Sequence, residues 1–229
     1  MRPIAIIIMI FWSSLFGKAA DVADWANKAR YAQANQELLA CGHDSLRIVM
    51  MGNSITEFWE ETHPWFFTSN HLICRGISGQ VSSQMLARFR QDVLQLKPRI
   101  VVINCGTNDI AENNGPYDED ITMDNIKSMT ELALAHGIEV VLTSVLPCDR
   151  FIWNTSVKDV VYKISRLNKR IVDYATSQHL HYIDYHSWMN TRDGSMISGY
   201  TDDGVHPNAA GYDMMEKVLM EKLDSLSNN

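Results

Sequence analysis

The sequence predicts an α/β fold in which a parallel β-sheet is covered by helices on both faces. Short apolar runs alternate with longer amphipathic segments through most of the chain. The apolar runs are continuous, which is typical of strands buried on both faces. The longer segments carry apolar residues at helical spacing, as the crossovers of a parallel sheet do. No repeat, low-complexity tract or linker interrupts the 229 residues, so they indicate one domain with an N-terminal extension.

Five apolar runs are the predicted strands. In chain order they lie at residues 47–51, 71–74, 100–104, 138–146 and 181–183. The predicted helices lie at residues 82–96, 118–136, 157–178 and 208–226. Pro98 ends the first of these helices and Gly137 the second, since proline cannot continue a helix and glycine favours its C-terminal turn. In folds of this class, ligands bind beyond the carboxyl ends of the strands, so we expect the functional residues just after the strands.

The first 20 residues predict a secretory signal peptide. Arg2 precedes a largely apolar run from residue 4 to residue 16, and the small residues Gly17 and Ala19 suit cleavage. A membrane anchor is the alternative, but a spanning helix needs about 20 apolar residues. We therefore expect a secreted or periplasmic domain at residues 21–229, with a helical arm at residues 21–43. We expect no membrane span in this mature chain.

The charge of the chain argues against anionic partners. The formal net charge is −7, and removal of the signal peptide leaves 18 basic and 27 acidic residues, a balance of −9. Binding to a phosphate backbone requires clustered Lys and Arg, and the sequence has no dense basic block. We therefore expect no nucleic-acid partner, and the same charge disfavours an anionic membrane surface. The sequence leaves the oligomeric state open.

The sequence gives little support for a metal or redox site. The four cysteines lack the C-x-x-C spacing of such sites, and we favour free thiols over disulfides for Cys41, Cys74, Cys105 and Cys148. His179 and His181 flank the start of a strand, but no carboxylate or cysteine completes a ligand set around them. We therefore expect no metal.

The first strand leads into residues 52–56 (GNSIT), which place Ser54 at a tight turn into a helix. In that position its hydroxyl is exposed above the sheet, and its own N–H points towards a developing anion. The alternative is an ordinary helix cap, because serine caps helices well. The sequence is not G-x-S-x-G, which excludes the α/β-hydrolase nucleophile elbow.

The second and third strands also lead into loops that suit an anion. Gly76 and Gly79 follow the second strand and allow positive φ and close approach of the backbone to a ligand. Residues 106–109 (GTND) follow the third strand, and Asn108 is a side-chain N–H donor for the same anion. The alternatives are a plain strand-to-helix turn in the first case and an Asx-turn in the second.

Near the C-terminus, residues 202–208 (DDGVHPN) contain a carboxylate three residues before a histidine. Asp203 is placed to hold Nδ1–H of His206, which leaves Nε2 as a base. Asp202 is a rival for this role, but the three-residue spacing selects Asp203. An exposed histidine in a helix-entry loop is the alternative for His206.

These blocks, taken in order, resemble the four signature blocks of the SGNH hydrolases, also called the GDSL-like esterase/lipase family. The matching segments are residues 52–56, Gly79, residues 106–109 and residues 203–206. The resemblance spans nearly all of the chain after the signal peptide. It implies a three-layer α/β/α sandwich with a flavodoxin-like, five-stranded parallel sheet, and a serine esterase that needs no cofactor.

Carried over by motif position, the resemblance also implies roles for individual residues. Ser54 resembles the nucleophile, His206 the base, and Asp203 the residue that orients it. The N–H groups of Ser54 and Gly79 and the side chain of Asn108 resemble the oxyanion hole. One position departs from the family, which most often has Asp where this chain has Asn53.

The expected substrate is a short-chain acyl ester, with acetyl the favoured group, on a small molecule or a glycan. Three tryptophans lie in segments near the proposed site: Trp59, Trp65 and Trp153. Packing in the core or at an interface is the alternative for all three and the favoured one for Trp65. Two further functions stay open: a lysophospholipase or thioesterase for longer chains, and an inactive glycan-binding module. A dinucleotide-binding protein is disfavoured because no G-x-G-x-x-G follows the first strand.

Overall fold

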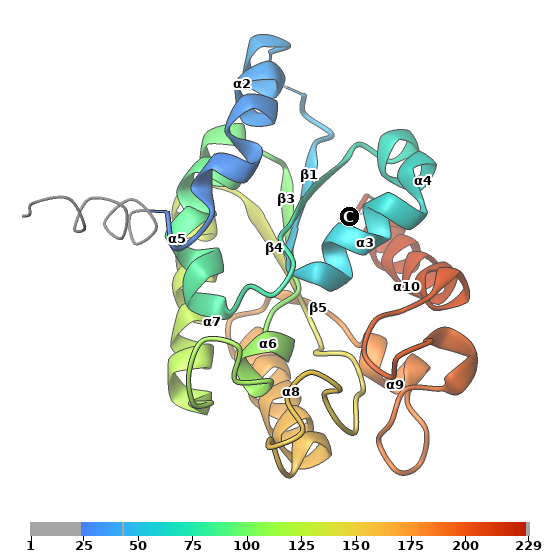
Figure 1. Cartoon of the computed structure of the whole chain (residues 1–229). Coiled ribbons are helices and arrows are strands. Elements are labelled where there is room, and N and C mark those ends of the chain that lie inside the picture. The colour runs from blue at the N-terminus through green and yellow to red at the C-terminus, as the bar shows by residue number, and fades with distance from the viewer. Residues whose placement is uncertain (1–23, 43, 228–229) are drawn as a thin grey trace, which may run out of the picture.

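The fold is a parallel five-stranded sheet between two layers of helices (Figure 1). A computed structural model describes residues 24–42 and 44–227. The strands are β1 (Ile48–Gly52), β2 (Leu72–Gly76), β3 (Ile100–Ile103), β4 (Glu139–Thr143) and β5 (His181–Ile183), in the order β2-β1-β3-β4-β5. This is the flavodoxin-like order, so the predicted fold class is confirmed. The predicted signal peptide and the first three residues of the arm lie outside the described residues.

Helices cover both faces of the sheet. They are α2 (Ala32–Ala40), α3 (Ser54–Thr62), α4 (Pro64–Ser69), α5 (Ser82–Asp92), α6 (Thr107–Ile110), α7 (Glu119–Ala135), α8 (Val160–Ser177), α9 (Tyr185–Met189) and α10 (Ala209–Ser227), with 3₁₀ turns η1 (Lys28–Tyr31), η2 (Leu94–Leu96) and η3 (Ser198–Tyr200). Among the helices described, none is long and apolar enough to cross a membrane.

The core consists of two apolar clusters, one on each face of the sheet. Alternate residues of β1 point to opposite faces, as in any strand. Val49 and Met51 pack with α5, α7 and α8, whereas Ile48 and Met50 pack with α3, α4, α9 and α10. The two layers lie on opposite sides of the sheet in Figure 1. All residues of β1 and β3 are buried, which explains why their sequences are continuous apolar runs.

Several boundaries differ from the predictions. The helix predicted at residues 82–96 ends at Asp92, and η2 follows it. The strand predicted at residues 138–146 ends at Thr143, and the helix predicted at 157–178 begins at Val160. Apolar residues continue past these ends because they line buried loops, as Leu146 does. The helical arm contains η1 and α2 within its described part.

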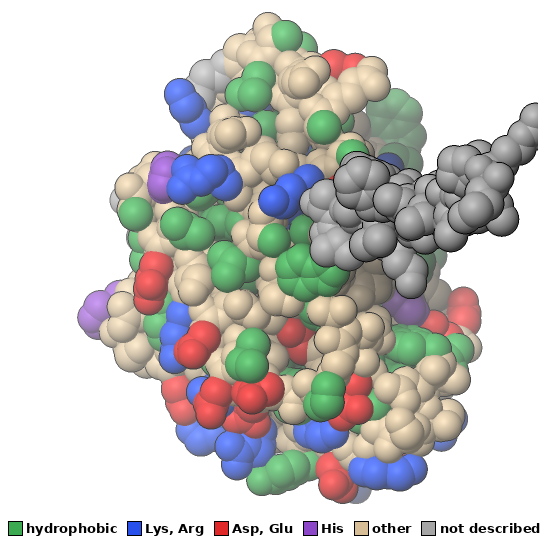
Figure 2. Space-filling view, turned by 60° about the vertical axis from the view of Figure 1, so that its left-hand side comes forward, with side chains coloured by type: hydrophobic (Ala, Val, Ile, Leu, Met, Phe, Trp, Pro, Cys, Tyr) green, Lys and Arg blue, Asp and Glu red, His purple; other side chains and the backbone are tan. Residues whose placement is uncertain are grey.

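Charged side chains of both signs lie on the surface of the domain. Figure 2 shows acidic and basic side chains interspersed on the face turned forward. Ion pairs of Arg166 and Arg170 with Glu119 join α8 to the start of α7. All four cysteines carry free thiols, as expected, and three of them are buried.

Candidate active site

The turn between β1 and α3 presents Ser54 at the N-terminus of the helix. Asn53 is the helix cap: its Oδ1 accepts a hydrogen bond of 3.0 Å from the N–H of Ile55. The alternative in which Ser54 itself caps the helix is therefore wrong. Because the turn is capped by its neighbour, the hydroxyl of Ser54 is free for another contact. The amide of Asn53 supplies the turn hydrogen bond that an Asp would make, while its buried Nδ2 has no partner among the residues that the structure describes.

The hydroxyl of Ser54 contacts a histidine that lies 152 residues away in the chain. Ser54 Oγ lies 2.9 Å from Nε2 of His206, and Nδ1 of His206 lies 2.7 Å from Oδ2 of Asp203. Since the carboxylate can only accept, Nδ1 carries a hydrogen and Nε2 accepts the hydrogen of Ser54. The sequence prediction that these three side chains meet is thus matched by their geometry. Asp202 does not take part, since its Oδ1 accepts from Asn208 instead.

Asp203 is fixed by four donors of its own loop: the hydroxyl of Thr201, the N–H groups of Val205 and His206, and the ring of His206. Its Oδ1 accepts from the N–H groups of Val205 and His206, both at 2.8 Å. Partial burial would raise the pKa of this carboxyl, but the hydrogen bonds from the ring and N–H of His206 and from Val205 outweigh it and leave the pKa below its ordinary value. The carboxylate therefore stays charged and holds the imidazole in one orientation.

Three N–H donors gather beside Ser54. The N–H groups of Ser54 and Gly79 have no acceptor within the described part of the chain. Asn108 donates one Nδ2 hydrogen to Gln80 O at 3.0 Å, and its Oδ1 accepts from Asn113 at 3.0 Å. These two contacts fix the amide so that Nδ2 keeps a second hydrogen to donate. Gly79 has φ of 77°, a left-handed conformation that favours glycine.

These residues surround a pocket of about 260 Å³. Its lining is Ser54, Phe58, Ser78, Gly79, Asn108, Asn113, Trp153 and His206. Two aromatic rings stand beside the imidazole of His206, with centroids 5.2 Å away for Phe58 and 6.0 Å away for Trp153. Indole Nε1 of Trp153 donates to Asn113 at 2.9 Å, which fixes this wall. The pocket thus offers a nucleophile–base pair, anion donors and small apolar walls.

The three tryptophans near the site differ in their surroundings. Trp153 lines the pocket, as the sequence suggested. Trp59 is buried in the core, 1% exposed, where it stacks on Phe66 and Tyr212. Trp65 is 82% exposed, so it does not pack in the core, and packing at an interface stays a prediction for it. It follows the proline that starts α4, and the apolar side chain buried from that helix is Phe67.

Two residues that support the site were not singled out from the sequence. Asp109 accepts from the N–H and hydroxyl of Ser82, which joins the loop of Asn108 to the start of α5. Burial raises the pKa of Asp109, and the hydrogen bonds from Ser82 oppose that rise. Glu57 lies one turn after Ser54 and accepts from Ser78. Asp109 belongs to the segment GTND, so the sequence could have indicated its role. The contact of Glu57 with Ser78 joins segments that sequence spacing does not connect.

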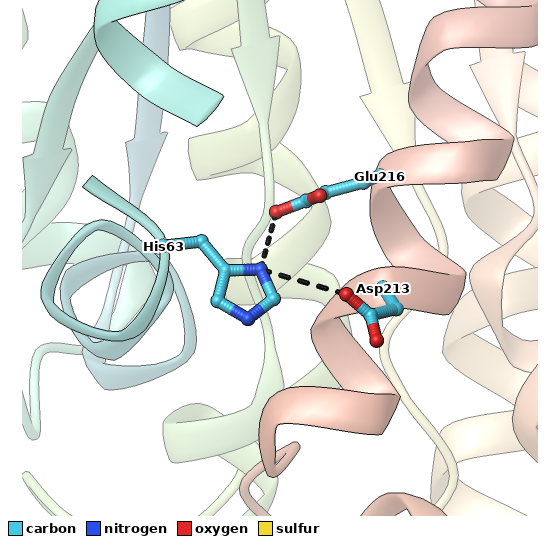
Figure 3. Close-up of side chains that lie close together, drawn as sticks. All are labelled: His63, Asp213 and Glu216. Carbon is cyan, nitrogen blue, oxygen red and sulfur yellow. Dashed lines mark hydrogen bonds and ion pairs between the residues drawn. The ribbon is translucent and has the colours of Figure 1, made fainter. Parts of the chain in front are cut away.

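Figure 3 shows a second group of polar side chains, at the junction of α3 and α10. His63 Nδ1 lies 2.6 Å from Glu216 Oε1 and 3.9 Å from Asp213 Oδ1. These three residues offer donor atoms for a metal. A contact of 2.6 Å, however, is a hydrogen bond from Nδ1, which leaves that nitrogen no lone pair for an ion. Glu216 also accepts from Trp59 Nε1 at 3.1 Å, so the group fastens α3 to α10.

Comparison with known proteins decides the family. The sequence profile of the GDSL-like Lipase/Acylhydrolase family matches residues 50–214. The chain belongs to this family. The match includes all four sequence blocks of the site and confirms the predicted family, and with it the predicted class of GDSL-type acylhydrolases.

Solved structures of this family are similar over most of the chain. A suspected acylhydrolase from Bacteroides fragilis is 50% identical with a TM-score of 0.86, and the similarity covers 89% of this chain and 98% of that one. A GDSL-like lipase from Bacteroides thetaiotaomicron is 47% identical with a TM-score of 0.85, covering 89% and 100%. An acetylxylan esterase from Xylanibacter ruminicola is 26% identical over 147 residues, which are 56% of this chain and 29% of that protein. The chain spans less than a third of the length of the curated relatives that it matches.

Proposed function

We propose that this GDSL-family protein is an exported serine esterase that removes short acyl groups, acetyl above all, from a saccharide. The observation that carries the proposal is the contact of 2.9 Å between Ser54 Oγ and His206 Nε2. It stands beside three N–H donors that are free to bind an oxyanion.

In the proposed reaction, Nε2 of His206 takes the hydroxyl proton as Ser54 Oγ attacks the ester carbonyl carbon. Asp203 holds Nδ1–H and stabilises the imidazolium that forms. The N–H groups of Ser54 and Gly79 and Nδ2 of Asn108 donate to the oxygen that becomes negative.

The second half of the reaction returns the enzyme to its starting state. The tetrahedral intermediate collapses when the ester C–O bond breaks, and the alcohol leaves with the proton from His206. Water then attacks the acyl-enzyme and gives a proton to the same nitrogen. The carboxylic acid leaves as Ser54 regains its proton. The scheme uses no metal and no cofactor.

The pocket favours a short acyl group. Its volume of about 260 Å³ is bounded by the rings of Phe58 and Trp153, which leave room for a few carbon atoms beside Ser54. A relative of the chain is an acetylxylan esterase, which removes acetyl groups, as its name states. We therefore assign acetyl as the preferred acyl group.

A groove of about 560 Å³ is lined in part by the Asp203 loop and suits the alcohol half. It is lined by Asp149, Arg150, Ile152, Ser195, Met196, Ser198, Thr201, Asp202, Asp203 and Gly204. Hydroxyls and charged groups on an aliphatic floor match the many hydroxyl groups of a sugar. The groove adjoins the pocket along the chain, since Ile152 precedes Trp153 and Asp203 holds His206. We therefore assign the saccharide to this groove.

The N-terminal 20 residues support export. Their charged start, apolar run and small residues are the features of a signal peptide, and a polymeric glycan ester is an extracellular substrate. N-terminal sequencing of the exported protein tests this part. A mature N-terminus near residue 20 is expected, and an intact N-terminus retained in the membrane fraction contradicts it.

Labelling with a fluorophosphonate tests the nucleophile. We expect one covalent adduct in the intact mass, on the peptide that carries Ser54, and none in Ser54→Ala. Ser128→Ala is the matched control, because Ser128 lies on α7, outside the pocket lining, and its loss should leave the adduct in place. An adduct on another residue contradicts the assignment. A folded protein that neither labels nor turns over esters is the inactive glycan-binding module instead.

A substrate series tests the acyl and alcohol groups. We expect kcat/KM to fall from p-nitrophenyl acetate to butyrate to octanoate, and to be higher for acetylated xylo-oligosaccharides than for p-nitrophenyl acetate. A preference for octanoate or for a lysophospholipid would identify the enzyme as a lysophospholipase or thioesterase. Equal kcat/KM for the sugar and nitrophenyl acetates would remove the saccharide from the proposal.

A further inference from the structure

The described part of the N-terminal arm, residues 24–42, lies outside the matched family segment. It packs against the loop that carries Gly79. The hydroxyl of Tyr31 donates to Gly76 O at 2.5 Å, directly before this loop. Gln80 Nε2, directly after Gly79, donates to Ala26 O at 2.7 Å. Both ends of the loop are therefore held by the arm.

Glu57 links the arm, the loop and the helix of Ser54. It lies on α3 one turn after Ser54, and its side chain is 13% exposed. Its Oε1 accepts from Arg30 of the arm at 2.9 Å. Its Oε2 accepts from the N–H of Ser78 at 2.7 Å and from the hydroxyl of Ser78 at 2.6 Å. One carboxylate thus receives three hydrogen bonds, one of them from a cation.

These hydrogen bonds act on the peptide that presents the Gly79 donor. The N–H of Gly79 belongs to the peptide between Ser78 and Gly79, and Gly79 has no side chain to restrain it. Glu57 fixes the peptide before this one through Ser78 N–H. Asn113 fixes the peptide after it by donating to Gly79 O at 3.2 Å. The direction of the Gly79 N–H therefore depends on a contact at each side.

We propose that Glu57 is a positioning residue that aligns the Gly79 N–H with Ser54, and that the arm holds Glu57 through Arg30. Glu57 touches no reacting atom, and the role rests on the proposed function of the site. It acts because a charged carboxylate binds backbone and hydroxyl donors about twice as strongly as a neutral acceptor does. Arg30 is half exposed, so its own share is the smaller one.

The test compares Glu57→Gln with Glu61→Gln, a matched change on the exposed side of the same helix. With p-nitrophenyl acetate, we expect Glu57→Gln to lower kcat about tenfold with KM changed less than twofold, since a full oxyanion donor is worth about 10²–10³. The affinity for an alkyl boronic acid, which forms a tetrahedral adduct on Ser54, should fall by the same factor. A loss that merely reflects stability would leave this affinity unchanged in the folded protein.

A kcat for Glu57→Gln within twofold of that for Glu61→Gln overturns the proposal, as does a lower kcat with unchanged boronic acid affinity. If Glu57→Gln does not fold, Arg30→Gln decides by the same two measurements, with an expected loss of about threefold. In the variant that combines Glu57→Gln with Arg30→Gln, we expect kcat to fall no further than in Glu57→Gln alone. A fall equal to the product of the two single losses overturns the role of Arg30. Failure of the proposed function is distinct, because then the wild type itself neither turns over the ester nor is labelled at Ser54.

Discussion

The two halves of the site are held in different ways. The half that would move the proton is local: Asp203 and His206 belong to one loop, and Oδ1 and Oδ2 of Asp203 bind groups at most three residues away. The half that would bind the oxyanion is assembled over distance. Gly79 and Asn108 come from two loops, and the loop of Gly79 is held by residues of the arm.

This difference separates what the motif supplies from what the surrounding structure supplies. The contact between Asp203 and His206 forms within the short segment DGVH. This half then needs only Ser54 to lie beside Nε2 of His206. The distant half depends on packing of the whole domain, including a segment outside the family match. We therefore expect changes in the local half to abolish proton transfer, and changes around the distant half to lower the rate in graded steps.

The largest effect is expected from Asp203→Asn in the local half. The amide cannot hold the imidazole in the required tautomer, so turnover of p-nitrophenyl acetate should fall by about 10⁴. Circular dichroism should show an unchanged fold, because the change keeps the size of the side chain. A loss of less than tenfold would mean that His206 does not depend on Asp203.

In the distant half, Asn108→Ala should lower kcat by about 10²–10³, the usual cost of one oxyanion donor. Steady-state kinetics with p-nitrophenyl acetate measures it. Asn108→Asp is the control for shape, since it fills the same space without an N–H donor and should lose as much. Retention of activity in Asn108→Asp would exclude this side chain from the oxyanion hole.

Trp153 bridges the two halves, because its ring lies beside His206 and its Nε1–H binds Asn113. Trp153→Ala should open the acyl pocket, so the ratio of kcat/KM between p-nitrophenyl acetate and butyrate should fall about tenfold. Trp65→Ala, an exposed tryptophan on α4, is the control and should keep the ratio. An unchanged ratio in Trp153→Ala would place the acyl group elsewhere.

The smallest effect concerns the stability of the distant half. Burial would raise the pKa of Glu57, but hydrogen bonds from Ser78 and Arg30 outweigh it and hold the pKa below the ordinary 4.5. The Glu57 carboxyl therefore binds a proton less tightly in the folded state than in the unfolded state. Its contribution to stability is complete above pH 4.5 and disappears as the pH falls through the folded pKa. Urea unfolding should show the wild type more stable than Glu57→Gln by about 1 kcal/mol at pH 7.

The same experiment at low pH checks the sign. As the pH falls below 4.5, the difference between wild type and Glu57→Gln should shrink, because the carboxyl becomes neutral first in the unfolded state and then in the folded state. A difference that grows as the pH falls would contradict the direction of the shift. The same measurements on Glu61→Gln serve as the matched control.

The sequence predicted the five strands and the contact between Asp203 and His206, for a physical reason. β5 begins and ends where its apolar run does, and the fixed spacing of Asp203 and His206 needs no knowledge of the fold. The sequence also predicted Ser54 at the turn before α3. It left open whether Ser54 caps this helix, because both Ser and Asn are good caps, and in the structure the cap is Asn53.

Contacts between segments that are distant in the chain could not be predicted from the sequence. Nothing in the spacing of Arg30, Glu57 and Ser78 indicates that they meet, because strand order brings them together. Trp59 and Trp65 lie close together in the sequence, yet one is buried and the other exposed. The difference depends on which side of α3 and α4 faces the core.

The nucleophile is the centre of this account, and Ser54→Ala tests it most directly. Hydrolysis of p-nitrophenyl acetate should be compared with that by the wild type at pH 7, with the fold checked by circular dichroism. We predict that kcat falls by about 10⁴–10⁶ while the fold is kept. Turnover by the variant within tenfold of the wild type would contradict the account.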